Sequence, residues 1–277
     1  MDAISTRFAK SPEAWRYVKA SHRVLNPTEP SEISHHLCAL AVMTKAPRTG
    51  HVKTRLAPPL TPDEAAALNA CFVRDTAIAL SDAVESGKRS GRNARGVAVY
   101  TPVGSENVYS DLLPPNFELI PQRDGSFGER LFFAAEDLFK CGFDSVCLID
   151  SDSPTVPVSS FGQAMDLLSL PGDRVVLGPT DDGGYYLIGL KEPRHELFER
   201  IDWSTERVFE QTVERAREIG VETKLLPSGY DVDDSASLRQ LCDELLSENS
   251  PADMARETRK FLKEIIEREG RERIWPI

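Results

Sequence analysis

Two aspartates stand one residue apart after the apolar run Ser145–Ile149: Asp150 and Asp152, in the sequence IDSDSP. Carboxylate oxygens are hard ligands that suit Mg²⁺ or Mn²⁺, and such an ion can bridge the phosphates of a nucleotide. A second acidic pair, Asp231 and Asp233, follows a later predicted strand and could add another carboxylate to the same ion. The alternative is structural, because Asp-x-Asp before Ser-Pro also forms an Asx-turn or a helix N-cap.

Positive charge is concentrated in TKAPRTGHVKTRL, the segment after the first apolar run. Lys45, Arg48, Lys53 and Arg55 surround Gly50 there, although the whole chain has a net charge of −11. Backbone N–H groups beside a glycine and the planar forks of arginine can both bind a diphosphate. The segment matches neither common glycine-rich phosphate motif, and a solvated basic loop is the alternative.

A third segment, GPTDDGGYYLIGL, combines acidic, flexible and aromatic residues at the start of an apolar run. Asp182 is followed by Gly183 and Gly184, and Tyr185 begins the run. Two glycines let a backbone approach a ligand closely, so these residues could shape a pocket. A tight turn between two strands is the alternative, because Asp-Gly is a common turn signal.

Two further segments could contact a substrate. PQRDGSFGERL places Gln122 and Gly125 just before a predicted helix, where free N–H groups suit a phosphate or a sugar. IDWSTERV contains Trp203, whose ring could stack on a substrate, although a tryptophan is more often part of a core.

These segments must be positioned by strands and helices that alternate along nearly the whole chain. Such alternation predicts an α/β fold with a mostly parallel sheet and helices on both faces. Ligands of such sheets bind at the carboxyl ends of the strands, which is where the segments above lie. The predicted strands are residues 37–43, 97–101, 117–121, 145–149, 174–179, 184–190 and 222–226, and residues 87–96 are predicted to be a surface loop.

Three regions are expected: an N-terminal extension (1–36), a nucleotide-binding domain (37–249) and a C-terminal helix (250–277). The extension could contain a short helix in SPEAWRYVKAS. The C-terminal helix places Met254, Phe261, Leu262 and Ile265 on one stripe. Such a stripe is costly to expose, so it is expected to pack on its own domain or, as the alternative, to form a homodimer contact.

Composition limits the class of partner. The chain has 277 residues and a charge of −11, which disfavours nucleic acid and anionic membranes as partners. No apolar run reaches the ~18–20 residues of a membrane span. The five cysteines are scattered in apolar runs and predict reduced core residues, so a cytoplasmic location is expected.

Taken together, the segments KAPRTGHVKTRL, GSFGERL, LIDSDSP, GPTDDGGYYLIGL, IDWSTERV and DVDD resemble, in this order, a bacterial family of glycosyltransferase-A-like proteins. Its members are similar to nucleotide-diphospho-sugar transferases and, more distantly, to guanylyltransferases of cofactor biosynthesis. The resemblance runs from about residue 37 to about residue 241. The chain departs from the family pattern at Ser126–Phe127, where an Asp-Leu pair often stands.

The resemblance implies a Rossmann-like glycosyltransferase-A fold with a divalent metal, Mg²⁺ or Mn²⁺, on the Asp-x-Asp. Asp152 and Asp233 would be the metal ligands, and Asp150 would contact the ribose or a metal-bound water. The expected nucleotide contacts are Lys45, Gly50, Lys53, Arg55, Gln122, Gly125 and Asp150. The expected acceptor contacts are Gly183, Gly184, Tyr185 and Trp203, with Asp182 as the base and with Lys53 and Arg55 stabilising the leaving diphosphate.

Three functions fit these residues. The first is metal-dependent transfer of a sugar from a nucleotide-diphospho-sugar to a small-molecule acceptor. The second is nucleotidyl transfer, in which a phosphorylated small molecule attacks a nucleoside triphosphate. The third, a non-catalytic nucleotide-binding protein, is disfavoured because clustered carboxylates repel one another unless a cation lies among them.

Overall fold

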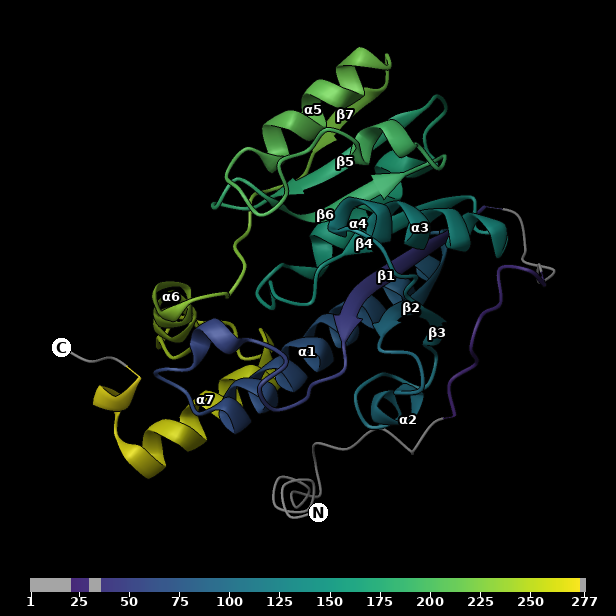
Figure 1. Cartoon of the computed structure of the whole chain (residues 1–277). Coiled ribbons are helices and arrows are strands. Elements are labelled where there is room, and N and C mark those ends of the chain that lie inside the picture. Colours follow the sequence, from purple (N-terminus) through teal and green to yellow (C-terminus); the bar gives the residue numbers. More distant parts are fainter. Residues whose placement is uncertain (1–20, 30–35, 275–277) are drawn as a thin grey trace.

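The computed structural model describes residues 21–29 and 36–274, and these form one seven-stranded sheet (Figure 1). The short helix expected in SPEAWRYVKAS lies almost wholly outside these ranges. Along the sheet the strand order is β3-β2-β1-β4-β6-β5-β7, and only β6 runs antiparallel to its neighbours. The predicted mostly parallel α/β fold is therefore confirmed. The strands are β1 Leu37–Lys45, β2 Asn93–Thr101, β3 Glu118–Pro121, β4 Ser145–Ile149, β5 Arg174–Pro179, β6 Tyr185–Leu190 and β7 Glu222–Leu225.

Helices cover both faces of the sheet. The α-helices are α1 Pro62–Arg89, α2 Glu106–Tyr109, α3 Phe127–Lys140, α4 Val158–Ser169, α5 Val208–Glu218, α6 Ser235–Leu245 and α7 Arg256–Glu269. Short 3₁₀ turns are η1 Thr54–Leu56, η2 His195–Phe198 and η3 Arg271–Arg273. None of the helices in the described ranges is both long and apolar enough to cross a bilayer.

Side-chain alternation along β1 builds two core layers. Leu40 and Val42 pack with α1 and α4 on one face, whereas Ala39 and Ala41 pack with α3 and α5 on the other. The period of two is that of a pleated strand, and burial on both faces explains why β1 is an unbroken apolar run. The carboxyl end of β1 therefore projects from a rigid core.

The prediction of a surface loop at residues 87–96 is wrong. Helix α1 continues to Arg89 and β2 begins at Asn93, so the connection is only a short turn. Gly87 reads as a loop residue, but a Cβ added there would lie 3.3 Å from Met165, so the glycine lets α4 pack closely on α1. A tertiary contact here overrides the local signal for a loop.

The C-terminal helices pack on α1 within the same chain (Figure 1). Phe261, Leu262 and Ile265 of α7 are buried in one cluster with Leu68 and Phe72 of α1. This is the intramolecular packing expected of the apolar stripe. The same cluster contains Leu56 of η1, so it also supports the basic segment after β1.

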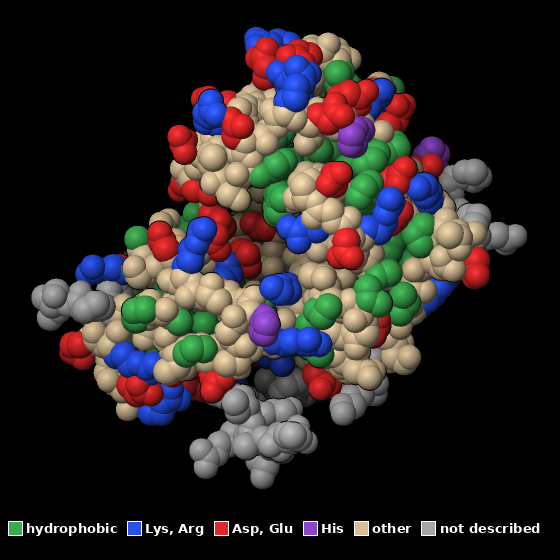
Figure 2. Space-filling view, viewed as in Figure 1, with side chains coloured by type: hydrophobic (Ala, Val, Ile, Leu, Met, Phe, Trp, Pro, Cys, Tyr) green, Lys and Arg blue, Asp and Glu red, His purple; other side chains and the backbone are tan. Residues whose placement is uncertain are grey.

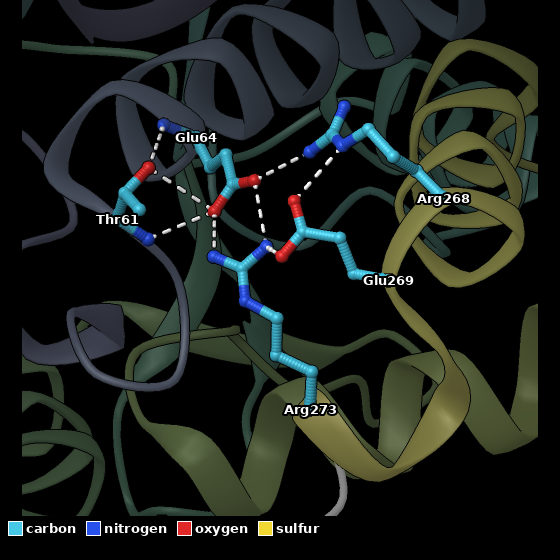
Figure 3. A network of polar contacts seen from close by, with 5 residues as sticks. All are labelled: Thr61, Glu64, Arg268, Glu269 and Arg273. Atoms are coloured by element: carbon cyan, nitrogen blue, oxygen red, sulfur yellow. Dashed lines mark hydrogen bonds and ion pairs between the residues drawn. The ribbon is translucent and has the colours of Figure 1, made fainter.

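An ion-pair network fastens the last described residues to the start of α1 (Figure 3). Glu64 accepts hydrogen bonds from Arg268 at 2.7 Å and from Arg273 at 3.0 Å, and it completes a capping box with Thr61. Burial raises the pKa of Glu64, but the hydrogen bonds from Arg273 and Thr61 outweigh it, and the pKa lies below its usual value. One carboxylate thus joins the α1 N-terminus to the chain's C-terminal segment.

Helix α7 takes its N-cap from another helix. Its own N-cap residue, Ala255, has no capping side chain. Asp75 of α1 instead accepts hydrogen bonds from the backbone N–H groups of Glu257 at 3.0 Å and Thr258 at 2.8 Å. Asp75 is only 6% exposed, and burial raises its pKa to about 6 despite those hydrogen bonds.

The Asp75→Asn variant is expected to change how stability depends on pH. Because the folded-state pKa lies above the unfolded value of ~3.9, ionisation of Asp75 costs the folded state, and stability falls as pH rises through this window to about 6. The wild type should therefore lose on the order of 2 kcal/mol of unfolding free energy that Asp75→Asn keeps. Urea unfolding at pH 4 to 7 measures this, with the exposed Asp82→Asn as the control. Parallel curves for wild type and Asp75→Asn would contradict the expectation.

Candidate active site

A cavity of about 750 Å³ opens at the carboxyl edge of the sheet. Figure 2 shows acidic and basic side chains around a hollow in the middle of this face. The cavity is lined by the ends of β1 and β4, the start of β6, and the segments that follow β3 and η2. It has the size of a small-molecule site and lies where open α/β sheets bind their ligands.

The antiparallel direction of β6 brings its first residues, and the turn before them, to this edge of the sheet. Because β6 is antiparallel to β4, its first residues lie beside the last residues of β4, and the backbone N–H of Asp150 donates to the carbonyl of Tyr186 at 2.9 Å. Asp182, Gly184 and Tyr185 therefore line the same cavity as Asp150.

Lys53 stands at the point where the two acidic segments meet. Its Nζ lies 3.0 Å from Asp152 and 2.8 Å from Asp233, and its side chain is only 5% exposed. Burial lowers the pKa of Lys53, but the charges of the two carboxylates outweigh it and leave the pKa above its usual value. Asp152 and Asp233 thus converge, as the sequence predicts, and they converge on an ammonium group.

The carboxylates around Lys53 are crowded. Burial, followed by the charge of Asp152, raises the pKa of Asp150 well above its usual range. Burial, followed by the charges of Asp182 and Asp233, raises the pKa of Asp231 to about 6. One ammonium group cannot compensate four carboxylates, so this end of the cavity favours an additional cation.

The donor set can be compared with what Mg²⁺ or Mn²⁺ requires. In the part of the chain that the structure describes, no three His, Cys, Asp or Glu side chains already surround one point closely enough to hold a metal. Asp152 and Asp233 nevertheless reach one atom, and hard oxygen ligands of like charge are the chemistry these ions prefer. The residues therefore fit a divalent metal in the place that Lys53 Nζ takes here.

Backbone contacts explain why the acidic segments lie side by side. The N–H of Val232 donates to the carbonyl of Asp152 at 2.9 Å, and the Val232 side chain is fully buried among the α6 and α7 residues. Asp150 also accepts from the N–H of Asp152 at 3.4 Å and from Ser153 Oγ at 2.8 Å. The Asx-turn considered from the sequence is thus present, and it orients Asp150 within the cavity.

The basic segment after β1 contributes Lys45, Lys53 and Arg55 to the cavity wall. Lys45 Nζ donates to the carbonyl of His51 at 3.0 Å, whereas Arg55 forms no ion pair within the described residues. Gly50 does not line the cavity; it has a positive φ of 73°, which makes it a turn residue rather than a contact. Arg55 is therefore an exposed cation of this wall that no carboxylate of the described residues pairs with.

The turn after β5 differs from the expectation in one respect. The close approach and the positive φ belong to Gly183, not Gly184: Gly183 has a φ of 88°, and a Cβ there would lie 2.1 Å from the Glu206 carbonyl oxygen. Gly183 does not line the cavity, whereas Gly184 does. Asp182 Oδ1 accepts from Thr180 Oγ1 at 2.6 Å and from the Gly184 N–H at 2.9 Å, which fixes its carboxylate.

The two glycines should therefore give different phenotypes. Gly183→Ala is expected to lower the unfolding free energy by about 2–4 kcal/mol, because a positive φ and a clash with backbone act together. Gly184→Ala should spare stability, but its Cβ would meet Thr180 Oγ1 at 3.0 Å and Asp182 Oδ1 at 3.2 Å and disturb that carboxylate. Thermal unfolding and turnover of both variants separate the effects. Equal stability losses at the two positions would be inconsistent with this geometry.

The third wall comes from α3 and the segment after η2. Gln122 and Trp203 line the cavity as predicted, whereas Gly125 does not. Phe127 and Arg130 of α3 also line it, although neither was among the predicted site residues. For Arg130 the available signal was its place in the GSFGERL segment.

Other lining residues were also missed. Asn69 of α1 has a buried side-chain oxygen without a hydrogen-bond partner in the described chain, and Thr44 and His51 line the cavity too. Asn69 is hidden in the sequence because it occupies an ordinary helix position. Buried unpaired oxygens are rare in folded proteins and point to a ligand or water in the cavity.

The chain was compared with known proteins. One family model, described as an uncharacterized protein conserved in bacteria (DUF2064), agrees with part of the sequence. Residues 88–205 match this family. No curated protein matches the chain. The matched range includes Asp150, Asp152 and Asp182 but not Lys53 or Asp233.

Among solved structures, the chain is similar to a "putative nucleotide-diphospho-sugar transferase" from Desulfovibrio desulfuricans G20. The identity is 29%, the match covers 85% of this chain and 98% of that chain, and the TM-score is 0.70. The resemblance read from the sequence is thereby confirmed, as is the fold.

More distant structures are also similar. One is a nucleotidyl transferase from Methanothermobacter thermautotroptrophicus, with 14% identity, 77% and 99% coverage of the two chains and a TM-score of 0.48. Another is a CMP:2-keto-3-deoxy-manno-octonic acid synthetase complexed with CTP, with 11% identity, 74% and 96% coverage and a TM-score of 0.44. At this level neither says anything about the chemistry of this chain.

Proposed function

We propose that this chain is a transferase that moves a sugar from a nucleotide-diphospho-sugar to a small acceptor, with a divalent metal at Asp152 and Asp233. The observation that carries the proposal is the composition of the cavity, where Lys53 and Arg55 stand beside crowded carboxylates. The likeness to the Desulfovibrio protein, which covers nearly all of that chain, supports it.

A bound Mg²⁺ or Mn²⁺ would neutralise the charge that develops on the leaving diphosphate. The side chains of Lys53 and Arg55 would bind the same diphosphate, with Arg55 free to offer its fork of donors. Asp150 would orient the donor, since it follows the end of β4 near the middle of the sheet and lines the cavity.

Asp182 would act as the base. Its Oδ1 is held by two hydrogen bonds, and Oδ2 has no hydrogen bond within the described residues. In the reaction the acceptor hydroxyl would lose its proton to Asp182, a bond would form between its oxygen and the sugar's anomeric carbon, and the bond from that carbon to the diphosphate would break. The nucleoside diphosphate would leave.

The products test this proposal. The wild type is incubated with nucleotide sugars or nucleoside triphosphates and Mn²⁺, and release of nucleoside diphosphate or pyrophosphate is measured with candidate acceptors. Release of nucleoside diphosphate supports sugar transfer. Release of pyrophosphate would show instead that the reaction is nucleotidyl transfer. A thermal-shift screen first selects the nucleotide, since a ligand at 100 times its Kd stabilises a fold by about 2.7 kcal/mol. If no nucleotide binds with or without Mn²⁺, the proposal is wrong.

A further inference from the structure

An aromatic pair forms part of the cavity wall. Phe127, the first residue of α3, packs against Trp203 with ring centroids 5.0 Å apart and an interplanar angle of 58°. Phe127 is 49% exposed, and it is the only aromatic residue among the exposed large apolar side chains of the described ranges. Exposed aromatic surface inside a cavity indicates a place where a ligand's apolar face is buried.

The pair is held in place by its surroundings. A Cβ added at Gly128 would lie 2.6 Å from Trp203 Nε1 and 2.8 Å from the Phe198 carbonyl, so only glycine allows this close packing. The segment that carries Trp203 is braced by hydrogen bonds from the Asp202 N–H to Gln211 at 2.7 Å and from Thr205 Oγ1 to the Asp202 carbonyl at 2.7 Å. The aromatic surface is therefore formed before any ligand binds, which lowers the cost of binding.

Arg130 lies one helical turn after Phe127 and carries an uncompensated charge. Its guanidinium carbon is 5.6 Å from the centroid of the Phe127 ring, and Arg130 lines the cavity. Within the described chain it forms no ion pair, and its Nε is buried without a hydrogen-bond partner. A buried unpaired donor beside a ring is the chemistry of an anion site next to a stacking surface.

A second arginine–phenylalanine pair close by shows the contrast. Arg123 stacks on Phe133 of α3 at 3.8 Å, but it is paired with Glu136 at 2.8 Å and with Asp137 at 3.2 Å. Neither Arg123 nor Phe133 lines the cavity. The paired arginine is therefore a structural element of the helix surface, whereas Arg130 is available to a ligand.

The aromatic pair and the donor cations belong to opposite faces of the sheet. Trp203 and Leu131 pack in the core layer of α3 and α5, whereas Leu56, which anchors the segment of Lys53 and Arg55, packs with α1, α6 and α7. Asp150 and Asp152, which follow β4, and Asp231 and Asp233 line the cavity together with Lys53 and Arg55. A group stacked on Phe127 is thus a different part of the reacting complex from the diphosphate.

We propose that Phe127, Trp203 and Arg130 form the acceptor subsite, and that the acceptor carries a flat ring together with an anionic group, a carboxylate or a phosphate. The ring stacks on the aromatic pair and the anion pairs with Arg130. This inference rests on the proposed function, because it assigns the substrate class of the same cavity. It places Phe127 and Arg130 in the site beside Trp203.

Phenyl phosphate and benzoate are the probes. Phenol and inorganic phosphate are the halves of the first, and benzamide and acetate stand for the ring and the anion of the second. Binding to the wild type is measured by ligand-observed NMR and calorimetry. Both ring-plus-anion probes should bind at least roughly tenfold more tightly than either half, because stacking and a charge-assisted hydrogen bond act together. A preference between the two probes identifies the anion. Equal affinities of the whole probes and their halves would overturn the proposal.

Variants locate the binding. Phe127→Leu and Arg130→Gln should each weaken phenyl phosphate binding roughly tenfold, since each removes one of the two contacts. The matched pair Phe133→Leu and Arg123→Gln, on an arginine–phenylalanine contact outside the cavity, should leave binding unchanged. Loss of binding in Lys53→Met but not in Phe127→Leu would place the probe among the donor cations and refute the assignment.

Nucleotide binding separates this inference from the proposed function. Phe127→Leu should bind the nucleoside diphosphate selected in the screen as tightly as the wild type does. If nucleotides bind the wild type but Phe127→Leu weakens them, the aromatic pair belongs to the donor and the acceptor assignment fails. If nucleotides do not bind but phenyl phosphate binds through Phe127 and Arg130, the subsite stands and the proposed function fails.

Discussion

Replacing Lys53 by Met is expected to lower turnover by roughly 100- to 1000-fold, because the variant lacks the cation closest to the predicted metal ligands. Lys53 Nζ contacts Asp152 and Asp233 at 3.0 and 2.8 Å. Its removal leaves these carboxylates, and the buried Asp150, without compensation. The two partners are 34% and 48% exposed, so solvent screening reduces the cost in stability to about 1–2 kcal/mol.

Mn²⁺ provides the decisive measurement for this variant. An ion held by Asp152 and Asp233 must take the place of Lys53 Nζ, so the wild type binds it against an existing ion pair. Lys53→Met has no ammonium to displace, and its melting temperature should rise more with Mn²⁺ than that of the wild type. Lys45→Met is the control, because Lys45 lines the same cavity but, among the described residues, its ammonium group donates only to a backbone carbonyl. An equal rise in Lys53→Met and the wild type would argue against a metal at this point.

Asp152→Asn is expected to abolish the Mn²⁺ dependence of nucleotide binding and to lower turnover by a similar factor, roughly 100-fold or more. The amide keeps the shape of the side chain and can still accept a hydrogen bond from Lys53, so the fold should remain stable. What it loses is the negative charge that a divalent ion requires. Asp233→Asn should weaken the same dependence.

Nucleotide titrations with and without Mn²⁺ measure this effect. Asp181→Asn is the matched control, because Asp181 neighbours the cavity residue Asp182 but does not line the cavity, and within the described residues its carboxylate accepts a hydrogen bond only from Ser228, at 3.0 Å. An Asp152→Asn variant whose nucleotide affinity still rises with Mn²⁺ as in the wild type would remove Asp152 from the metal site.

Much of the fold is readable from local sequence. Thr61 and Glu64 predict the start of α1 through a capping box, and that box is present. The apolar run of β6 likewise predicts a buried strand, but no local pattern indicates whether that strand runs parallel or antiparallel to its neighbours. Its antiparallel pairing with β4 depends on residues far along the chain, such as the contact of Asp150 with Tyr186. Strand direction was therefore beyond the sequence alone.

The sequence predicts which segments form the site, but not which side chains of those segments contact one another. End-of-strand positions identify Asp150, Asp152 and Asp233 as cavity residues, because ligands of parallel sheets bind there. The contact of Lys53 with Asp233, however, joins positions 180 residues apart. Arg130 reads as an ordinary charged helix residue, and only the surrounding structure shows that no carboxylate in residues 21–29 and 36–274 forms an ion pair with it.

Val232 has a consequence for recombination between relatives. Its side chain belongs to the packing of α6 and α7, its N–H is bonded to the Asp152 carbonyl, and its two neighbours are the aspartates of the cavity. Consider a chimera that takes its C-terminal helices from a relative but keeps residues 228–234 of this chain. In it, Val232 would pack against helices of a different sequence, and the positions of Asp231 and Asp233 would depend on that altered packing. Crossovers before residue 228 carry the pair together with its support. Sequence exchange among such proteins should therefore treat residues 228–274 as one heritable block.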